Sequence, residues 1–313
     1  MESSIAAPFL SSGLAARERR RRVSVLGSET TVFTYEPVPG TAAPAGGGRP
    51  DGTVTVLAVH GFRGTHHGLL RIVDALPQVR FVMPDLPGFG ESTELAGVPH
   101  GIEGYGAWLR GLAEALGLGG DTVLLGHSFG SIVAAHFVAA DPERFARLVL
   151  VNPISAPALE GPQAVMSRLA EFYYWAAARL PHAAGSALLR SSAVVRVMSE
   201  TMAKTRDAGL REFVHAQHAA HFSEFSSRTM LLEAFKASIS HHAAEVAGQL
   251  ALPVLLIAGD RDEVAHLPDV RRFHDALPDS RLTVIDGVGH LIHYETPQPA
   301  AAAISAFLQE ETA

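Results

Sequence analysis

Short, almost wholly apolar runs alternate along this chain with longer segments of helical character. The apolar runs lie at 54–59, 81–84, 121–125, 147–151, 253–259 and 282–285. Near-continuous apolar strands are typical of parallel sheets that are covered on both faces. Strands that alternate with helices indicate crossovers between parallel neighbours. The pattern therefore predicts an α/β fold with a mainly parallel central sheet flanked by helices.

Helical patterns fill the intervals between these runs. We expect helices near 69–76, 102–117, 131–140, 268–277 and 299–309. Before them, residues 23–36 alternate well enough to form a pair of strands, with Gly27-Ser28 as the turn. The stretch from Pro37 to Gly52 is rich in Pro, Gly and Ala, which is typical of a loop.

The pattern changes between residues 153 and 247, where strand-like runs are absent. This interval predicts several helices, with breaks at Pro162, Pro181-His182 and Gly209. The domain boundaries follow from it: a core formed by 23–152 and 248–313, and an inserted helical unit at 153–247. Residues 1–22, which contain five arginines between positions 17 and 22, are expected to form a mobile arm.

Composition narrows the function classes. The chain has 313 residues, of which 47% are hydrophobic and 18% charged, as in a globular enzyme. Its net charge of −7 argues against a broad nucleic-acid-binding face. No apolar run reaches the ~18 residues of a membrane span. The first residues lack the basic region of a signal peptide, so we expect a cytoplasmic protein.

One motif stands at the junction of a strand and a helix. Gly126-x-Ser128-x-Gly130 follows the apolar run 121–125 and opens the helical run 131–140. Such a strand–turn–helix elbow lifts a serine hydroxyl above a sheet, and its tight turn favours glycine on both sides of the serine. Because a serine holds its proton too tightly to attack unaided, a base must lie elsewhere in the chain.

Four further segments complete a resemblance to the α/β-hydrolase family, which extends over nearly the whole chain after about residue 23. Val54–Phe62 resembles the family's oxyanion strand and loop, and Pro84–Ser92 resembles the turn after its next strand. Pro253–Asp262 and Leu282–His290 resemble the acid and base segments, in the family's order of Ser, Asp, His. The resemblance implies that residues 153–247 form a helical cap.

The resemblance also assigns the catalytic roles. Ser128 is the expected nucleophile, His290 the base and Asp262 the acid that orients the imidazole. His293 is the alternative base, although it lies beyond the Gly-x-Gly-His turn. Asp260 is the alternative acid at the end of the same strand.

Backbone amides are expected to form the oxyanion hole. The donors are the N–H of Phe129, directly after the serine, and the N–H of Phe62, with Arg63 as the alternative to Phe62. Asp85 is expected to stabilise a turn. Gly88-x-Gly90 is a structural turn and not a phosphate loop, because no lysine follows it.

Aromatic and methionine side chains are frequent in the helical insertion. Some are expected to roof an apolar pocket, and Trp175 and Phe222 are chosen as substrate contacts. The rest are expected to pack within the helices. His215, His218 and His221 recur at a spacing of three, but no acidic partner accompanies them, so we expect neither a metal nor a cofactor.

These features predict a cofactor-free serine hydrolase that cleaves a small to medium, apolar carboxylic ester through an acyl-enzyme. One alternative is a hydrolase of carbon–carbon bonds of the meta-cleavage type, which would use cations of the cap, namely Arg190, Arg196, Lys204, Arg206 and Arg211, for a substrate carboxylate. The other is a ligand-binding receptor on a hydrolase scaffold. The expected partner is a small-molecule substrate, and the sequence leaves the oligomeric state open.

Overall fold

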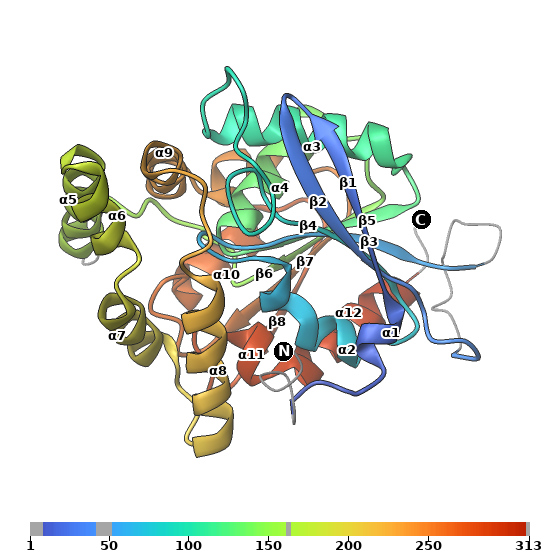
Figure 1. The fold of residues 1–313 in the computed structure, drawn as a ribbon. Coiled ribbons are helices and arrows are strands. Elements are labelled where there is room, and N and C mark those ends of the chain that lie inside the picture. The colour runs from blue at the N-terminus through green and yellow to red at the C-terminus, as the bar shows by residue number, and fades with distance from the viewer. Residues whose placement is uncertain (1–8, 42–51, 161–163, 311–313) are drawn as a thin grey trace.

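A twisted sheet lies at the centre of the computed structural model, which describes residues 9–41, 52–160 and 164–310 (Figure 1). Within these residues the sheet has eight strands in the order β1-β2-β4-β3-β5-β6-β7-β8. β2 is antiparallel to both of its neighbours, and every other pair is parallel. The strands are β1 (Glu18–Val25), β2 (Ser28–Tyr35), β3 (Thr55–Val59), β4 (Arg80–Pro84), β5 (Thr122–His127), β6 (Arg147–Val151), β7 (Val254–Gly259) and β8 (Ser280–Ile285). The predicted α/β fold is confirmed.

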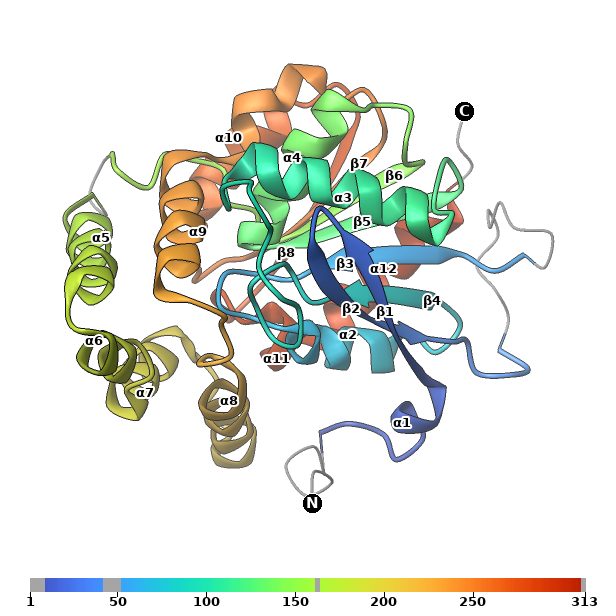
Figure 2. The ribbon, with the colours of Figure 1, turned by 45° about the horizontal axis from the view of Figure 1, so that its top comes forward.

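Helices cover both faces of the sheet, as Figure 2 shows. α3 (Ile102–Leu116), α4 (Phe129–Ala140) and α10 (Leu267–Ala276) pack on one face. α2 (Leu70–Ala75) and α12 (Pro297–Gln309) pack on the other. β3, β5, β6 and β7 are buried along their whole length, which is why their sequences are almost continuously apolar.

Between β6 and β7 the chain forms helices that stand along one side of the sheet (Figures 1 and 2). They are α5 (Ala164–Arg179), α6 (His182–Leu189), α7 (Ser192–Met202), α8 (Ala208–His221) and α9 (Arg228–Ser240), followed by the 3₁₀ helix η3 (Ala243–Gln249). Pro181 separates α5 from α6. Gly209 does not interrupt a helix. Asp207 caps the start of α8, and the glycine lies in the first turn of that helix. Pro162 lies outside the described residues.

The N-terminal segment differs from the expected mobile arm. α1 (Leu14–Arg17) leads into β1, and all eight residues of β1 pair with β2. Arg17 is only 8% exposed, and its guanidinium donates hydrogen bonds to the carbonyl oxygens of Glu36, Val73 and Val79. The prediction was therefore wrong for residues 14–22, because charged side chains are also common on an edge strand, where they discourage pairing with other chains. Residues 1–8 lie outside the described part.

The turn between the first two strands is also displaced by one residue from the prediction. Leu26 and Gly27 form it, with φ angles of 49° and 72°, and β2 already begins at Ser28. Elsewhere two short helices, η1 (His66–Leu69) and α11 (Ile292–Glu295), follow β3 and β8. Among the described residues, no helix is both long and apolar enough to cross a membrane.

Candidate active site

Ser128 lies at a sharp turn between β5 and α4. Its backbone has φ 52° and ψ −119°, an unfavourable conformation for a residue with a side chain. The turn is held by hydrogen bonds from the Ser128 N–H to the Val151 carbonyl and from the Ser131 N–H and Oγ to the Ser128 carbonyl. Ser131 Oγ also accepts the N–H of Ile154, so it ties the turn to the loop after β6.

Close approach of backbones explains the two glycines of the motif. A Cβ on Gly126 would overlap the carbonyl oxygen of Gly130, and a Cβ on Gly130 would overlap that of Val59 in β3. The expectation that bulk on either side of the serine would clash is confirmed. The elbow is therefore packed directly against the neighbouring strand and its loop.

The three side chains chosen from the sequence meet at the carboxyl ends of β5, β7 and β8. Ser128 Oγ lies 2.7 Å from His290 Nε2, and His290 Nδ1 lies 2.9 Å from Asp262 Oδ2. The second carboxylate oxygen, Oδ1, accepts the backbone N–H groups of Val264 and Ala265 at 2.8 and 2.9 Å. Burial acts to raise the pKa of Asp262, but the facing imidazole and these hydrogen bonds outweigh it and lower the pKa.

The two alternative residues lie elsewhere. Asp260 Oδ1 accepts the N–H of Gly287 at 2.6 Å, so this carboxylate joins the end of β7 to the turn after β8. His293 is buried with its ring centroid 4.1 Å from that of His127. The contact with the serine hydroxyl is made by His290.

Asn152 is a site residue that the sequence analysis missed. It follows β6, is fully buried, and has a φ of 47°. Its amide nitrogen donates to Asp262 Oδ2 at 2.8 Å and to the Gly289 carbonyl at 3.2 Å, so it connects the acid loop with the histidine loop. The sequence signal is weak: an asparagine, which tolerates positive φ, stands directly after a buried strand and before a proline.

Two further histidines flank the group formed by Ser128, His290 and Asp262. Burial and the neighbouring His290 lower the pKa of His127 to about 3. Burial and nearby histidines also hold the pKa of His293 well below its ordinary value. Both rings are therefore neutral at neutral pH and add no positive charge beside His290.

His60 positions the loop that carries Phe62. Its Nε2 accepts the backbone N–H of Leu86 at 2.8 Å, so the proton is on Nδ1, which donates to the Gly61 carbonyl at 2.9 Å. Burial lowers its pKa, which keeps the ring neutral. The next residue, Arg63, has a φ of 57° and directs its buried side chain toward the inserted helices, where it donates to the carbonyl of Leu189.

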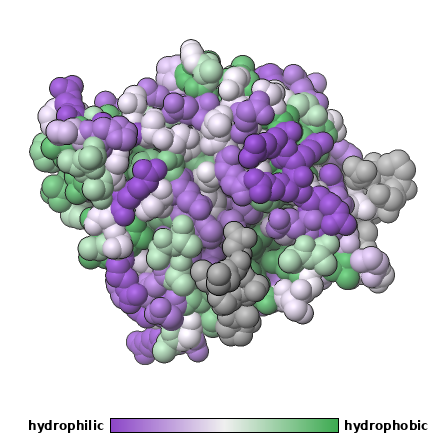
Figure 3. Space-filling view, in the orientation of Figure 1, coloured by the Kyte–Doolittle hydropathy of each residue, from purple (hydrophilic) through white to green (hydrophobic). Residues whose placement is uncertain are grey.

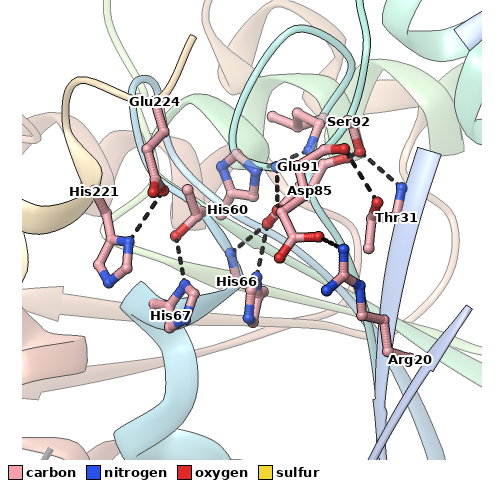
Figure 4. A network of polar contacts seen from close by, with 12 residues as sticks. Arg20, Thr31, His60, His66, His67, Asp85, Glu91, Ser92, His221 and Glu224 are labelled. Atoms are coloured by element: carbon pink, nitrogen blue, oxygen red, sulfur yellow. Dashed lines mark hydrogen bonds and ion pairs between the residues drawn. The ribbon is translucent and has the colours of Figure 1, made fainter. Parts of the chain in front are cut away.

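A polar network connects the segment after the Phe62 loop with the turn that follows β4, and Figure 4 shows Asp85 at the centre of this network. Asp85 Oδ1 accepts the backbone N–H of His66 at 2.8 Å and lies 2.9 Å from its Nδ1. Oδ2 accepts the N–H of Glu91. Ser92 Oγ, in turn, donates to the Asp85 carbonyl and accepts the N–H of Thr31 (Figure 4). Asp85 thus stabilises the turn, as predicted.

A cavity of about 1040 Å³ opens beside Ser128. The core contributes Phe62, Phe129 and His290 to its lining. The inserted helices contribute mainly apolar side chains, among them Met166, Ala170, Met198, Met202, Phe235 and Ile239. Phe222 also lines the cavity, as chosen from the sequence.

Trp175 does not line this cavity. It is 39% exposed, its ring centroid lies 5.7 Å from that of Phe172, and the Arg179 guanidinium lies over it. Figure 3 shows hydrophobic residues at the edge of the molecule where α5 lies. The choice of Trp175 as a substrate contact was therefore wrong: helical periodicity does not say which of two apolar faces is covered.

Comparison with known proteins agrees with this architecture. The family model of the alpha/beta hydrolase fold matches residues 54–297. Lipase 3 of Moraxella sp. (strain TA144) is 22% identical over 259 residues, covering 80% of this chain and 76% of the lipase.

Solved structures share the fold. A thermophilic esterase from Thermogutta terrifontis matches with a TM-score of 0.68 at 23% identity. The match covers 93% of this chain and 98% of the esterase. A carboxylesterase from Bacillus subtilis has a TM-score of 0.70 at 17% identity, with 93% and 91% covered. The chain belongs to the α/β hydrolase fold family, and it is a hydrolase.

Proposed function

We propose that this hydrolase cleaves carboxylic esters through an acyl-enzyme formed on Ser128. The observation that carries the proposal is the unbroken hydrogen-bond chain from Ser128 Oγ through His290 to Asp262, with distances of 2.7 and 2.9 Å. The names of the relatives, which include lipases and esterases, support the choice of an ester.

The acylation step follows from these positions. His290 Nε2 takes the proton of Ser128 as its oxygen attacks the ester carbonyl. Asp262 holds the proton on Nδ1 and stabilises the imidazolium that forms. The N–H groups of Phe129 and Phe62 stabilise the negative oxygen of the tetrahedral intermediate, each by about 3 kcal/mol. His290 then returns the proton to the leaving alcohol.

Deacylation repeats the sequence with water as the nucleophile. His290 removes a proton from the water, which attacks the acyl-serine carbonyl, and the acid leaves when the proton returns to Ser128. The loop held by His60 needs no rearrangement between the two steps, because its hydrogen bonds already fix its shape. Donors fixed in advance contribute most to such reactions.

The substrate class follows from the cavity. We propose that residues 153–247 act as a cap, and that the acyl group lies between Phe222, Phe235 and Ile239 of this cap and the elbow. A cavity of about 1040 Å³ lies slightly above the usual ligand-site range of roughly 300–1,000 Å³, so it has room for medium-length acyl chains.

The alternative of carbon–carbon bond hydrolysis has less support. None of the five cap cations considered for a substrate carboxylate lines the described cavity. Arg196 and Arg211 are paired with Glu200, and Lys204 with Glu263. Arg63 lines the cavity, but backbone carbonyls already accept two of its donors.

An ester series tests the proposal. p-Nitrophenyl esters of increasing chain length are assayed with the wild type, with Ser128→Ala, and with Ser24→Ala, an exposed serine of β1, as the matched control. Ser128→Ala should lose about 10³-fold or more in kcat/KM while the control keeps it. A serine-reactive fluorophosphonate should label the wild type and the control but not Ser128→Ala. Retained hydrolysis in a folded Ser128→Ala protein would refute the serine mechanism.

A further inference from the structure

A second cluster of ionisable side chains lies on the outer side of α4, away from the elbow. His136 comes from α4, His241 from the link after α9, and Glu245 from η3. Glu245 Oε2 lies 3.2 Å from His136 Nε2 and 3.1 Å from His241 Nδ1. All three atoms lie within 4.8 Å of one another. Three different segments therefore direct one nitrogen or oxygen each toward a common point.

Two of the three distances between these atoms suit a metal site, and the third is at most 4.8 Å. Zinc binds imidazole nitrogen and carboxylate oxygen at about 2.0–2.2 Å, so neighbouring ligand atoms in a tetrahedral site lie roughly 3.3 Å apart. Both contacts of Glu245 Oε2 already have nearly this length. Two imidazoles and one carboxylate are also a set that suits zinc and its neighbours better than magnesium or calcium.

We propose that His136 Nε2, His241 Nδ1 and Glu245 Oε2 bind a divalent transition-metal ion, with Zn²⁺ as the first candidate. The side chains are 18%, 36% and 30% exposed, so the ion can enter from solvent and water can take the fourth position. Binding requires that His136 Nε2 and His241 Nδ1, which face Glu245 Oε2, carry no hydrogen, so that each ring holds its proton on the other nitrogen.

The position of this site indicates a structural role for the ion and not a catalytic one. His136 lies eight residues after Ser128, or about 12 Å along α4, too far for the ion to touch a substrate at the serine. His241 follows α9, whose residues Ser238 and Ile239 line the cavity. The Ala243 N–H is bonded to the Ile154 carbonyl beside the same cavity. A bound ion would thus fasten the end of the inserted helices to the elbow helix.

A competing explanation needs no metal. Glu245 Oε1 also accepts the backbone N–H of His242, so Glu245 acts as an ordinary cap of η3, with the two imidazoles as hydrogen-bond donors to its other oxygen. In that case the cluster would have no affinity for Zn²⁺ beyond that of exposed histidines. The two explanations therefore differ in metal affinity and in which residues carry it.

Titration of Zn²⁺ into the metal-stripped full chain tests the proposal. We expect one ion per chain by calorimetry and a rise in Tm that EDTA reverses, with no such rise for Mg²⁺. His136→Gln and His241→Gln should each weaken the affinity by about tenfold or more. His182→Gln, at an exposed histidine of α6, is the matched control and should bind as the wild type does.

Two further measurements separate loss of the metal site from misfolding and from failure of the ester-hydrolase proposal. If the half-buried His136→Gln fails to fold, the more exposed His241→Gln decides alone, with its metal-free Tm showing that it is intact. Ser128→Ala should bind Zn²⁺ normally, so a failure of the ester-hydrolase proposal would leave this one standing. Equal affinity in the wild type and His241→Gln, or no saturable binding at all, would overturn it.

Discussion

Replacing Asp262 by asparagine should stop turnover through the tautomer of His290. Asp262 Oδ1 accepts two backbone N–H groups, from Val264 and Ala265. The amide of Asp262→Asn must keep its oxygen on that side, because its NH₂ group would otherwise face two donors. The NH₂ group is then forced to the position of Oδ2, opposite His290 Nδ1, which lies 2.9 Å from Oδ2 in the wild type.

This orientation fixes the size of the effect. A donor opposite His290 Nδ1 moves the ring proton to Nε2, and Nε2 can no longer accept the proton of Ser128. A wrong tautomer in such a triad costs about 10⁴-fold in kcat, which is about 5.4 kcal/mol of barrier at 1.36 kcal/mol for each factor of ten. The NH₂ group also meets the donating amide of Asn152, so we expect a loss of about 1–3 kcal/mol in the free energy of unfolding.

The assay is steady-state hydrolysis of one p-nitrophenyl ester, with kcat and KM measured separately. KM should change little, because Asp262 does not line the described cavity. Asp260→Asn is the matched control: its amide oxygen can still accept the N–H of Gly287, so its kcat should stay within a few-fold of the wild type. A kcat for Asp262→Asn within tenfold of the wild type, or an equally inactive Asp260→Asn, would refute this reasoning.

Three further results are expected. Gly130→Ala should lower the free energy of unfolding by more than about 2 kcal/mol in urea denaturation, because its methyl group would overlap a β3 carbonyl; a neutral result would contradict the close packing of the elbow. Phe222→Ala should alter the chain-length preference for esters and Trp175→Ala should not, since only the former lines the cavity; equal shifts would contradict the assignment of the lining. Burial lowers the folded-state pKa of His127 and of His218 to about 3, whereas unfolded histidine titrates near pH 6.5. The unfolded state therefore binds more protons between these values, so the free energy of unfolding should fall with acidification below about pH 6.5, by up to about 1.4 kcal/mol per pH unit for each histidine; a flat profile from pH 7 to 5 would contradict their neutral burial.

The sequence by itself determined the sheet and the order of its functional segments. Strands buried on both faces are mostly apolar, so β3, β5, β6 and β7 were visible as nearly continuous apolar runs. The elbow was visible for a related reason, because backbone contact at Gly126 and Gly130 admits no side chain. Both requirements act on single residues or short segments, so they restrict which residue types occur there and can be recognised in the sequence.

Contacts between distant segments were decided only by the tertiary structure. Asn152 joins the acid and histidine loops across more than a hundred residues, and an asparagine between a buried strand and a proline is only a weak sign of that role. The arginines of β1 have the same charge on an edge strand as on a mobile arm. Trp175 belongs to an apolar helical stretch whether it faces the cavity or solvent. In each case the sequence fixes the chemistry of a side chain, whereas the partner that it meets depends on how separate elements pack, and that is set by the whole chain.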